Sequence, residues 1–382
     1  MTVCLSHISA LDFFRAANVS KVDILGLPRT GKFDACDAST VFDALASSGF
    51  PAYLKPPVHV LVKGRSHSHS EKNVIRHSCH SDLPNRAFIR LTDELMVVSP
   101  ELCSLQLCAT LPELDAALAI FELCGVYSLK PNTNPRFSET QATNASAMRK
   151  IEPEDFFGLE EENPKTYGTR TYSQPDIARK DVYAFAASQA QEQLPHMTIK
   201  DWGFYNRENR LTSCKRIASF ADSVPGAHGL GKLRTVLKYV LDNSASPMET
   251  ALALMVTGPA RIGGMGFKGA TLNHRVNTIH GERRIDLLWA EQKFGLEYQG
   301  FDSHEGWTNR VKDDRRRNAI AAEGIDIASV YYQDLASPFH FDALISNIAR
   351  IMGKRVRITT KDHRYKQMLL RKAVLPPASA KR

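Results

Sequence analysis

Residues 283–300 read Arg-Arg-Ile-Asp-Leu-Leu-Trp-Ala-Glu-Gln-Lys-Phe-Gly-Leu-Glu-Tyr-Gln-Gly, two apolar runs separated by a short polar turn. Each run contains one carboxylate, Asp286 in the first and Glu297 in the second. A carboxylate within a strand rich in Leu, Ile and Phe is costly to bury unless it is paired, hydrogen-bonded or bound to a metal ion. The stretch therefore predicts two neighbouring strands that carry a pair of acidic side chains with a specific task.

The alternation of strand side chains predicts how these acids are arranged. Glu297 and Gln299 share one face of their strand, whereas Leu296 and Tyr298 share the other. Asp286 on the neighbouring strand can meet the first pair, which gives a compact cluster of oxygen atoms, the ligand type that Mg²⁺ or Mn²⁺ prefers. The simpler alternative is a pair of strand-edge carboxylates that form salt bridges with Arg283 or Arg284.

The segments around this hairpin extend the pattern to a complete folding unit. Ser246 or Ser244 can cap a helix whose first turn holds Pro247 and Glu249. Three strands over residues 273–279, 283–290 and 293–299, a helix over 305–323 and a strand over 325–332 follow. The predicted order is α-β-β-β-α-β, with the carboxylates on the second and third strands of the β-meander.

Residues 228–336 resemble the PD-(D/E)XK nuclease superfamily, in particular its Vsr-like (DUF559) branch. The landmarks that carry the resemblance are Ser246-Pro247-Met248-Glu249, Asp286, Glu297-Tyr298-Gln299-Gly300, His304, and Asp313, Arg316, Ile320 and Gly324 in the spacing D-x-x-R-x-x-x-I-x-x-x-G. The resemblance implies a restriction-endonuclease-like core that hydrolyses phosphodiester bonds of DNA with Mg²⁺ or Mn²⁺ as cofactor.

The resemblance also implies roles for individual residues. Asp286 and Glu297 are the expected metal ligands, and Glu249 is expected to reach the ion directly or through water. Gln299 stands where the superfamily usually has lysine, so it can orient a water molecule or a phosphate but carries no positive charge. His304 is expected to be a general acid or base or a phosphate contact; the alternative is a solvated loop histidine.

Basic residues indicate DNA as the partner. Arg310, Lys312, Arg315, Arg316 and Arg317 fall on the predicted helix 305–323, where they can bind phosphates or form i,i+3 pairs with Asp313 and Asp314. Residues 353–382 hold ten Lys and Arg against one acid, in a chain whose net charge is +8. Lys354, Arg355 and Arg357 of this basic tail are predicted DNA contacts; the alternative is a solubilising, partly disordered tail.

Residues 1–150 predict a separate mixed α+β domain. Helical spacing covers His7–Ala17, 102–107 and 111–123, and strand composition covers 52–54, 58–62, 88–91 and 95–98. Ser99 fits a helix cap before Pro100. The strand-rich segment, then Val98-Ser99-Pro100-Glu101, then the Leu/Ala-rich helices to Gly125 resemble the AbiEi-like antitoxin family of bacterial abortive-infection systems. This implies a regulatory or targeting domain that binds a toxin or another protein.

The predicted organisation has four parts: the N-terminal domain 1–150, a linker and helical connector over 151–227, the nuclease-like domain 228–352, and the basic tail 353–382. Residues 130–182 are rich in Pro, Asn, Thr, Ser and Glu, as is typical of linkers. Helical patterns are expected over 180–193, 216–223 and 232–243. The fold class is therefore α/β, or α+β in several domains.

Composition places the chain among cytoplasmic proteins. Hydrophobic residues make up 43% and charged residues 24%, and no apolar run approaches a membrane span or follows a basic N-terminal segment as in a signal peptide. Seven scattered cysteines read as reduced thiols. Ser66-His67-Ser68-His69 with His77, Cys79 and His80 could bind zinc, but a polar loop explains this spacing more simply.

Two functions from different classes follow. The first is a metal-dependent DNA endonuclease in phage defence or DNA repair, with Glu249, Asp286 and Glu297 at its centre. The second is a non-catalytic AbiEi-like antitoxin or transcriptional regulator, whose degenerate nuclease fold binds DNA. Gln299 favours the second function, and the presence of three carboxylates together favours the first. Convergence of the three carboxylates on one point would discriminate between them.

Overall fold

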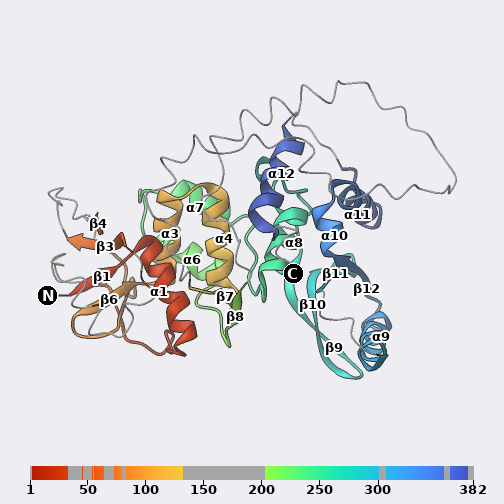
Figure 1. The fold of residues 1–382 in the computed structure, drawn as a ribbon, viewed down its shortest axis with the longest axis horizontal. Helices are drawn as coiled ribbons and strands as arrows, with labels where there is room; N and C mark the ends of the chain where they lie inside the picture. The colour runs from red at the N-terminus through yellow and green to blue at the C-terminus, as the bar shows by residue number, and fades with distance from the viewer. Residues whose placement is uncertain are drawn as a thin grey trace. The chain divides into compact units, whose positions relative to one another are not determined.

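The computed structural model describes residues 2–32, 45, 54, 56–63, 73–79, 83–131, 203–300, 307–356 and 362–376, with the backbone alone for 307–314. Within these residues the chain is a mixed α/β protein with several sheets (Figure 1), so the predicted fold class is confirmed. The predicted strand residues 52–53, the predicted linker from 132 to 182 and the predicted helix 180–193 lie outside the described residues.

The N-terminal part is built on a six-stranded sheet with the order β2-β5-β6-β1-β3-β4. Its strands are β1 (Val3–Leu5), β2 (Arg29–Thr30), β3 (Val58–Lys63), β4 (Val74–Cys79), β5 (Phe88–Arg90) and β6 (Leu95–Val98). The pairs β1–β6 and β3–β4 are parallel, whereas the other neighbours are antiparallel. Helix α1 (His7–Val19) and β3 match the predicted helix 7–17 and strand 58–62. The two elements are in contact.

The first helix after the sheet begins at the capping residues that the sequence predicts. Ser99 caps α3 (Pro100–Thr110) by accepting the Leu102 amide, and Pro100 occupies the first turn. Then come α4 (Glu113–Cys124), the strand pair β7 (Tyr127–Leu129) and β8 (Phe204–Asn206), α6 (Cys214–Asp222) and α7 (Leu230–Val236).

The predicted helix over 232–243 is wrong in its second half, because α7 ends at Val236. Beyond it the chain turns so that Asp242 Oδ1 accepts the Cys214 amide at 2.8 Å, at the start of α6. Asn243 then adopts the left-handed conformation, with a φ of 70°. Tertiary contacts such as this one can override a helical pattern in the sequence.

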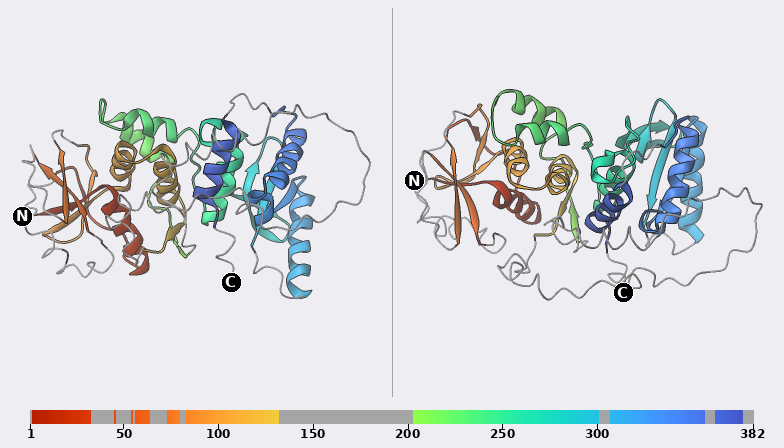
Figure 2. Two further views of the ribbon diagram at one scale, coloured as in Figure 1. Left: turned by 45° about the horizontal axis from the view of Figure 1, so that its top comes forward. Right: turned by 90° about the horizontal axis from the view of Figure 1, so that it is seen from above.

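The C-terminal part has the predicted order α-β-β-β-α-β. It consists of α8 (Pro247–Thr257), β9 (Thr271–Thr278), β10 (Gly281–Trp289), β11 (Phe294–Gln299), α9 (Trp307–Ala322) and β12 (Asp326–Tyr331), with a short 3-10 helix, η6 (Ala260–Ile262), after α8. The sheet order is β12-β11-β10-β9, and only the β11–β12 pair is parallel. Helix α8 contacts β10 and β11, whereas α9 contacts β9 and β12 (Figure 1), and the turned views show the sheet between α8 and α9 (Figure 2).

Three further helices complete this part: α10 (Tyr332–Ala336), α11 (Pro338–Ile351) and α12 (His363–Val374). Helix α12 lies within the predicted basic tail, yet it packs against α8 and η6 and buries Leu370 and Val374. Two of its cations are engaged within the chain, because Arg364 bonds Asp342 at 2.7 Å and the Arg371 guanidinium lies 4.8 Å from the centre of the Phe341 ring. The alternative of a purely solubilising tail therefore does not hold for residues 363–374.

Candidate metal-dependent nuclease site

The site begins where β10 and β11 separate. Their pairing runs from Trp289↔Phe294 to Leu287↔Leu296, so Asp286 and Glu297 stand directly beyond the last pair. There the Tyr298 amide donates to Asp286 Oδ2 at 2.8 Å. In a regular ladder this amide would face the backbone of the neighbouring strand. The carboxylate of Asp286 thus lies between the two strands and is fixed by a main-chain donor.

The alternation predicted for β11 is present. Leu296 and Tyr298 pack against the larger apolar core. On the opposite face, a Cβ at Gly295 would meet Ile285 and Ile327, which belong to a smaller cluster with Ile320 of α9. Glu297 follows the face of Gly295, and its side chain is almost completely buried at 4% exposure.

Glu249 lies in the first turn of α8 and has a structural role of its own. Its amide donates to Ser246 Oγ at 3.1 Å, while its carboxylate accepts the Ala245 amide at 2.8 Å and the Ser246 hydroxyl at 3.2 Å. This arrangement is a variant of the capping box, in which a side chain three residues into a helix satisfies donors at the start of that helix. Of the two serines proposed as the cap, Ser246 is the one that occupies the position.

Glu249 and Asp286 are electrostatically coupled. Burial, and then the nearby charge of Asp286, raise the pKa of Glu249 to about 7. Burial also raises the pKa of Asp286, against the lowering effects of the Tyr298 amide and of Arg316. Both carboxyl groups are therefore disfavoured as anions. A cation bound between them would stabilise their ionised forms.

The structure places Arg316 on Glu297. Arg316 Nη2 donates to Glu297 Oε1 at 2.9 Å and to the carbonyl oxygen of Arg284 at 2.7 Å. The residue was predicted to bind a phosphate or to pair with Asp313 of its own helix. It supplies the ion pair to Glu297 that the simpler alternative assigned to Arg283 or Arg284. The side chain of Asp313 lies outside the described residues.

The three carboxylates do not converge tightly. Among the residues that the structure describes, Glu249, Asp286 and Glu297 do not form a group whose ligand atoms all lie within 4.8 Å of one another. The capping bonds hold Glu249 toward its own helix, and Arg316 holds Glu297. Binding of one ion by all three would therefore require rotation of side chains. By the criterion of convergence on one point, this arrangement favours the non-catalytic regulator over the nuclease.

Asn273 of β9 is a site residue that the sequence reasoning missed. Its neighbours pair regularly with β10, as Leu272↔Leu287 and His274↔Ile285, so Asn273 stands opposite Asp286. Its φ is 49°, in the left-handed region, and its side-chain amide donates to Glu249 Oε2 and, at 2.9 Å, to the Asn243 carbonyl. An asparagine within a predicted strand was the available signal, since asparagine is unfavourable in strands but tolerates this conformation.

The other predicted residues are less informative. Gln299 is half-buried at the end of β11, and Arg315, Arg317, Lys354 and Arg355 are exposed. Arg317 Nη2 donates to Ser329 Oγ on β12. His304 and Arg357 lie outside the described residues, and Arg310 and Lys312 lie on the part of α9 whose side chains are not described.

No helix in the described part of the chain is long and apolar enough to cross a membrane. No protein-family model, curated protein or solved structure matched the chain. The resemblances to nuclease and antitoxin families therefore remain predictions, and the arguments for function rest on the geometry of Glu249, Asp286 and Glu297.

Proposed function

We propose that the chain is a metal-dependent DNA endonuclease whose ion is held by Asp286 and Glu297, with Glu249 as a third or water-mediated ligand. The observation that carries this proposal is the position of the acids. Glu249 and Asp286 come from different elements, and the charge of Asp286 adds to burial in raising the pKa of Glu249 to about 7, beside the buried Glu297. A divalent cation would favour the ionised forms of Glu249 and Asp286, because both have raised pKa values.

The residues present fit Mg²⁺ or Mn²⁺, because every side-chain donor in the set is an oxygen. A bound ion would neutralise charge on the scissile phosphate and lower the pKa of a water molecule. The protein would orient that ion by Asp286, which is itself fixed by the Tyr298 amide. Gln299 would orient a water molecule or a phosphate oxygen, and Arg316, once released from Glu297, would face the phosphate.

The test is cleavage of supercoiled plasmid, mismatched duplex and single-stranded DNA by purified protein with Mg²⁺, with Mn²⁺ and with a chelator. Asp286→Asn and Glu297→Gln should abolish cleavage. Glu282→Gln is the matched control, because Glu282 lies on the same strand as Asp286 but its side chain is exposed and paired with Arg275. Cleavage that persists in Asp286→Asn would exclude this site.

The second candidate is a non-catalytic DNA-binding regulator, an AbiEi-like antitoxin whose N-terminal domain contacts a toxin or another protein. The specific observation in its favour is that Arg316 and the capping bonds account for Glu297 and Glu249 without any metal ion. It predicts that wild type and Asp286→Asn bind DNA equally and that neither cleaves any of the three substrates. A metal-dependent product that disappears in Asp286→Asn would exclude it.

A further inference from the structure

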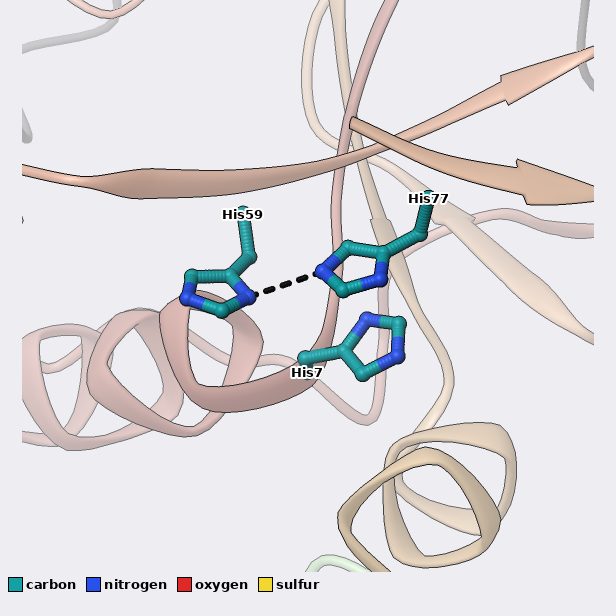
Figure 3. A group of neighbouring side chains, drawn as sticks. All are labelled: His7, His59 and His77. Atoms are coloured by element: carbon teal, nitrogen blue, oxygen red, sulfur yellow. Dashed lines mark hydrogen bonds between the residues drawn. The ribbon is translucent and has the colours of Figure 1, made fainter. Parts of the chain in front are cut away.

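Three histidines from distant parts of the sequence meet in the N-terminal sheet. His7 is the first residue of α1, His59 lies on β3 and His77 lies on β4 (Figure 3). His77 pairs with Leu61, two residues from His59, so the parallel register puts both histidines on the same face of the sheet. Helix α1 contacts β3 and carries His7 to that face.

The three side chains are within reach of one ion. One ring nitrogen from each histidine can be chosen so that all lie within 4.8 Å of one another. His59 Nδ1 and His77 Nε2 are 2.8 Å apart, and the rings of His7 and His77 are stacked with their centres separated by 3.5 Å. Two nitrogens bound to one tetrahedral zinc ion are about 3.3 Å apart. Binding would replace the His59–His77 hydrogen bond and turn the stacked rings so that one nitrogen of each faces the ion.

The backbone around the cluster is held by several independent contacts. His7 has a φ of 51°, in the left-handed region, which is unfavourable for a residue with a Cβ. Gln106 Oε1 accepts its amide at 3.0 Å, and Ser6 Oγ lies 3.0 Å from its Nδ1. The His59 amide donates to Ser9 Oγ at 2.9 Å. Unfavourable backbone conformations that the surroundings enforce are concentrated at functional sites.

We propose that His7, His59 and His77 bind one divalent transition-metal ion of the zinc class. Three imidazoles leave the fourth position of a tetrahedral ion open to water or to another ligand. Neutral imidazole is the form that coordinates metal, and each of the three rings offers a nitrogen to the group. The site is distinct from the carboxylate site in both place and ligand type.

A second group, Cys124, Cys214 and Asp242, also has ligand atoms within 4.8 Å of one another, but its contacts explain it without an ion. Asp242 accepts the Cys214 amide and pairs with Arg210, and Cys214 Sγ donates to the Val240 carbonyl. Burial raises the pKa of Cys124, which opposes formation of the thiolate that would bind metal. This group serves as the internal comparison.

The proposed site also gives a role to one histidine of the histidine-rich sequence around residue 77. The sequence favoured a polar loop for His67, His69, His77, Cys79 and His80. His67, His69 and His80 lie outside the described residues, whereas His77 joins two histidines that the sequence did not single out. Because β4 is at the edge of the six-stranded sheet, a metal ion here would tie that edge to β3 and α1.

The experiment is metal analysis of the full chain, purified without a polyhistidine tag, stripped with chelator and dialysed against a slight excess of Zn²⁺. Wild type should retain one equivalent by mass spectrometry. His59→Gln and His77→Gln should fall to background, whereas His280→Gln, an exposed histidine at the β9–β10 turn, and Cys214→Ser should retain the ion. Retention of no zinc by wild type, or of equal zinc by wild type and both cluster variants, would overturn the proposal.

The Co²⁺-substituted wild type provides a readout that does not depend on the folding of a variant. A site made of imidazoles should give four-coordinate ligand-field bands without thiolate-to-cobalt charge transfer. Strong thiolate charge transfer would assign the ion to Cys124 and Cys214 and overturn the histidine site. Circular dichroism of each variant shows whether loss of metal reflects loss of a ligand or loss of the fold.

Discussion

Arg316 Nη2 lies 2.9 Å from Glu297 Oε1, so a helix on one side of the sheet neutralises a carboxylate that is 4% exposed on a central strand. The same nitrogen donates to the Arg284 carbonyl at 2.7 Å, which fixes the guanidinium at the opening between β10 and β11. Either this pair is the resting state of a metal site, or it is the reason that no metal is needed.

Replacement of Arg316 distinguishes between these two roles of the Arg316–Glu297 pair. Arg316→Gln should lower the free energy of unfolding by about 1–3 kcal/mol, because Glu297 loses its charged partner while it stays buried. If Glu297 is a ligand, the variant should also bind Mn²⁺ more tightly, since the ion no longer competes with the guanidinium. Urea unfolding and Mn²⁺ titration by electron paramagnetic resonance measure the two effects. Arg315→Gln, an exposed neighbour, should change neither. Weaker Mn²⁺ binding in Arg316→Gln would contradict competition.

Glu249 should make the stability of the metal-free protein depend on pH. Its folded pKa of about 7 lies above its ordinary value of 4.5, so the folded state keeps a proton that the unfolded state releases. Stability should therefore fall as pH rises from 4.5 to 7, by at most about 3 kcal/mol. Glu249→Gln should remove this slope, and Mg²⁺ should stabilise wild type more at pH 8 than at pH 6. Equal slopes in denaturant titrations of both proteins would refute the raised pKa.

Glu122 should stabilise the N-terminal part at neutral and alkaline pH. This stabilisation should be lost in acid. Arg15 donates to its carboxylate at 2.7 and 2.9 Å, and the Leu129 amide donates at 3.1 Å. Although burial opposes ionisation, these partners lower the pKa of Glu122. The resulting stability is present above pH 4.5 and is lost as pH falls through the folded pKa.

The size of this contribution can be measured by substitution. Glu122→Gln should cost about 3–5 kcal/mol, because it leaves Arg15 buried without a full counter-charge, and Arg15→Met in the same chain should recover part of the loss. Asp222→Asn, which removes an exposed pair with Arg234, should cost less than about 1 kcal/mol. Similar costs for the two single variants would show that the buried pair is not important for stability.

Helix α12 should be part of the folded core. Leu370 is 1% exposed, so Leu370→Ala should lower stability by about 2–4 kcal/mol. Lys372→Ala, two residues further on an exposed face, should have an effect within about 0.5 kcal/mol. Thermal and urea unfolding of the full chain compare the two. An unchanged midpoint in Leu370→Ala would mean that α12 does not pack on α8.

If DNA binds to the segment after α11, the dependence of the DNA affinity on salt concentration should reveal that contact. Lys354 and Arg355 are exposed, and each phosphate contact contributes about 0.9 to the slope of log affinity against log salt concentration. Lys354→Ala with Arg355→Ala should therefore reduce the slope by about 2. Arg364→Ala is the control, since Asp342 already binds that guanidinium at 2.7 Å. A slope that is unchanged in the double variant places the DNA elsewhere.

The features predicted from sequence are those with local causes. Alternation placed Leu296 and Glu297 on opposite faces, and Ser99 and Ser246 began helices because a hydroxyl three residues before a free amide caps it. What the sequence could not predict depends on contacts between distant segments. Asp242, beyond the end of α7, accepts the Cys214 amide, and Arg316 donates to Glu297 beyond the last β10–β11 pair.

The histidine cluster shows the same limit. His59 is a single polar residue in a run of valines and leucine, and His7 begins a helix 52 residues earlier in the chain, so neither pattern indicates the other. Only the parallel pairing of β3 with β4 and the packing of α1 bring the rings together. Spacing in the sequence is informative for ligands on one element, and these ligands lie on three.

The contact between α12 and α8 has a consequence for synthesis of the protein. A ribosome that has passed Tyr331 has made every strand of the carboxylate sheet, but the helix that covers α8 begins only at His363. The nascent chain therefore carries Glu249, Asp286 and Glu297 before the helix of Glu249 has its full packing. Assembly of the acidic centre is thereby tied to synthesis of α12, so translation products that stop before this helix would not display the centre in its final form.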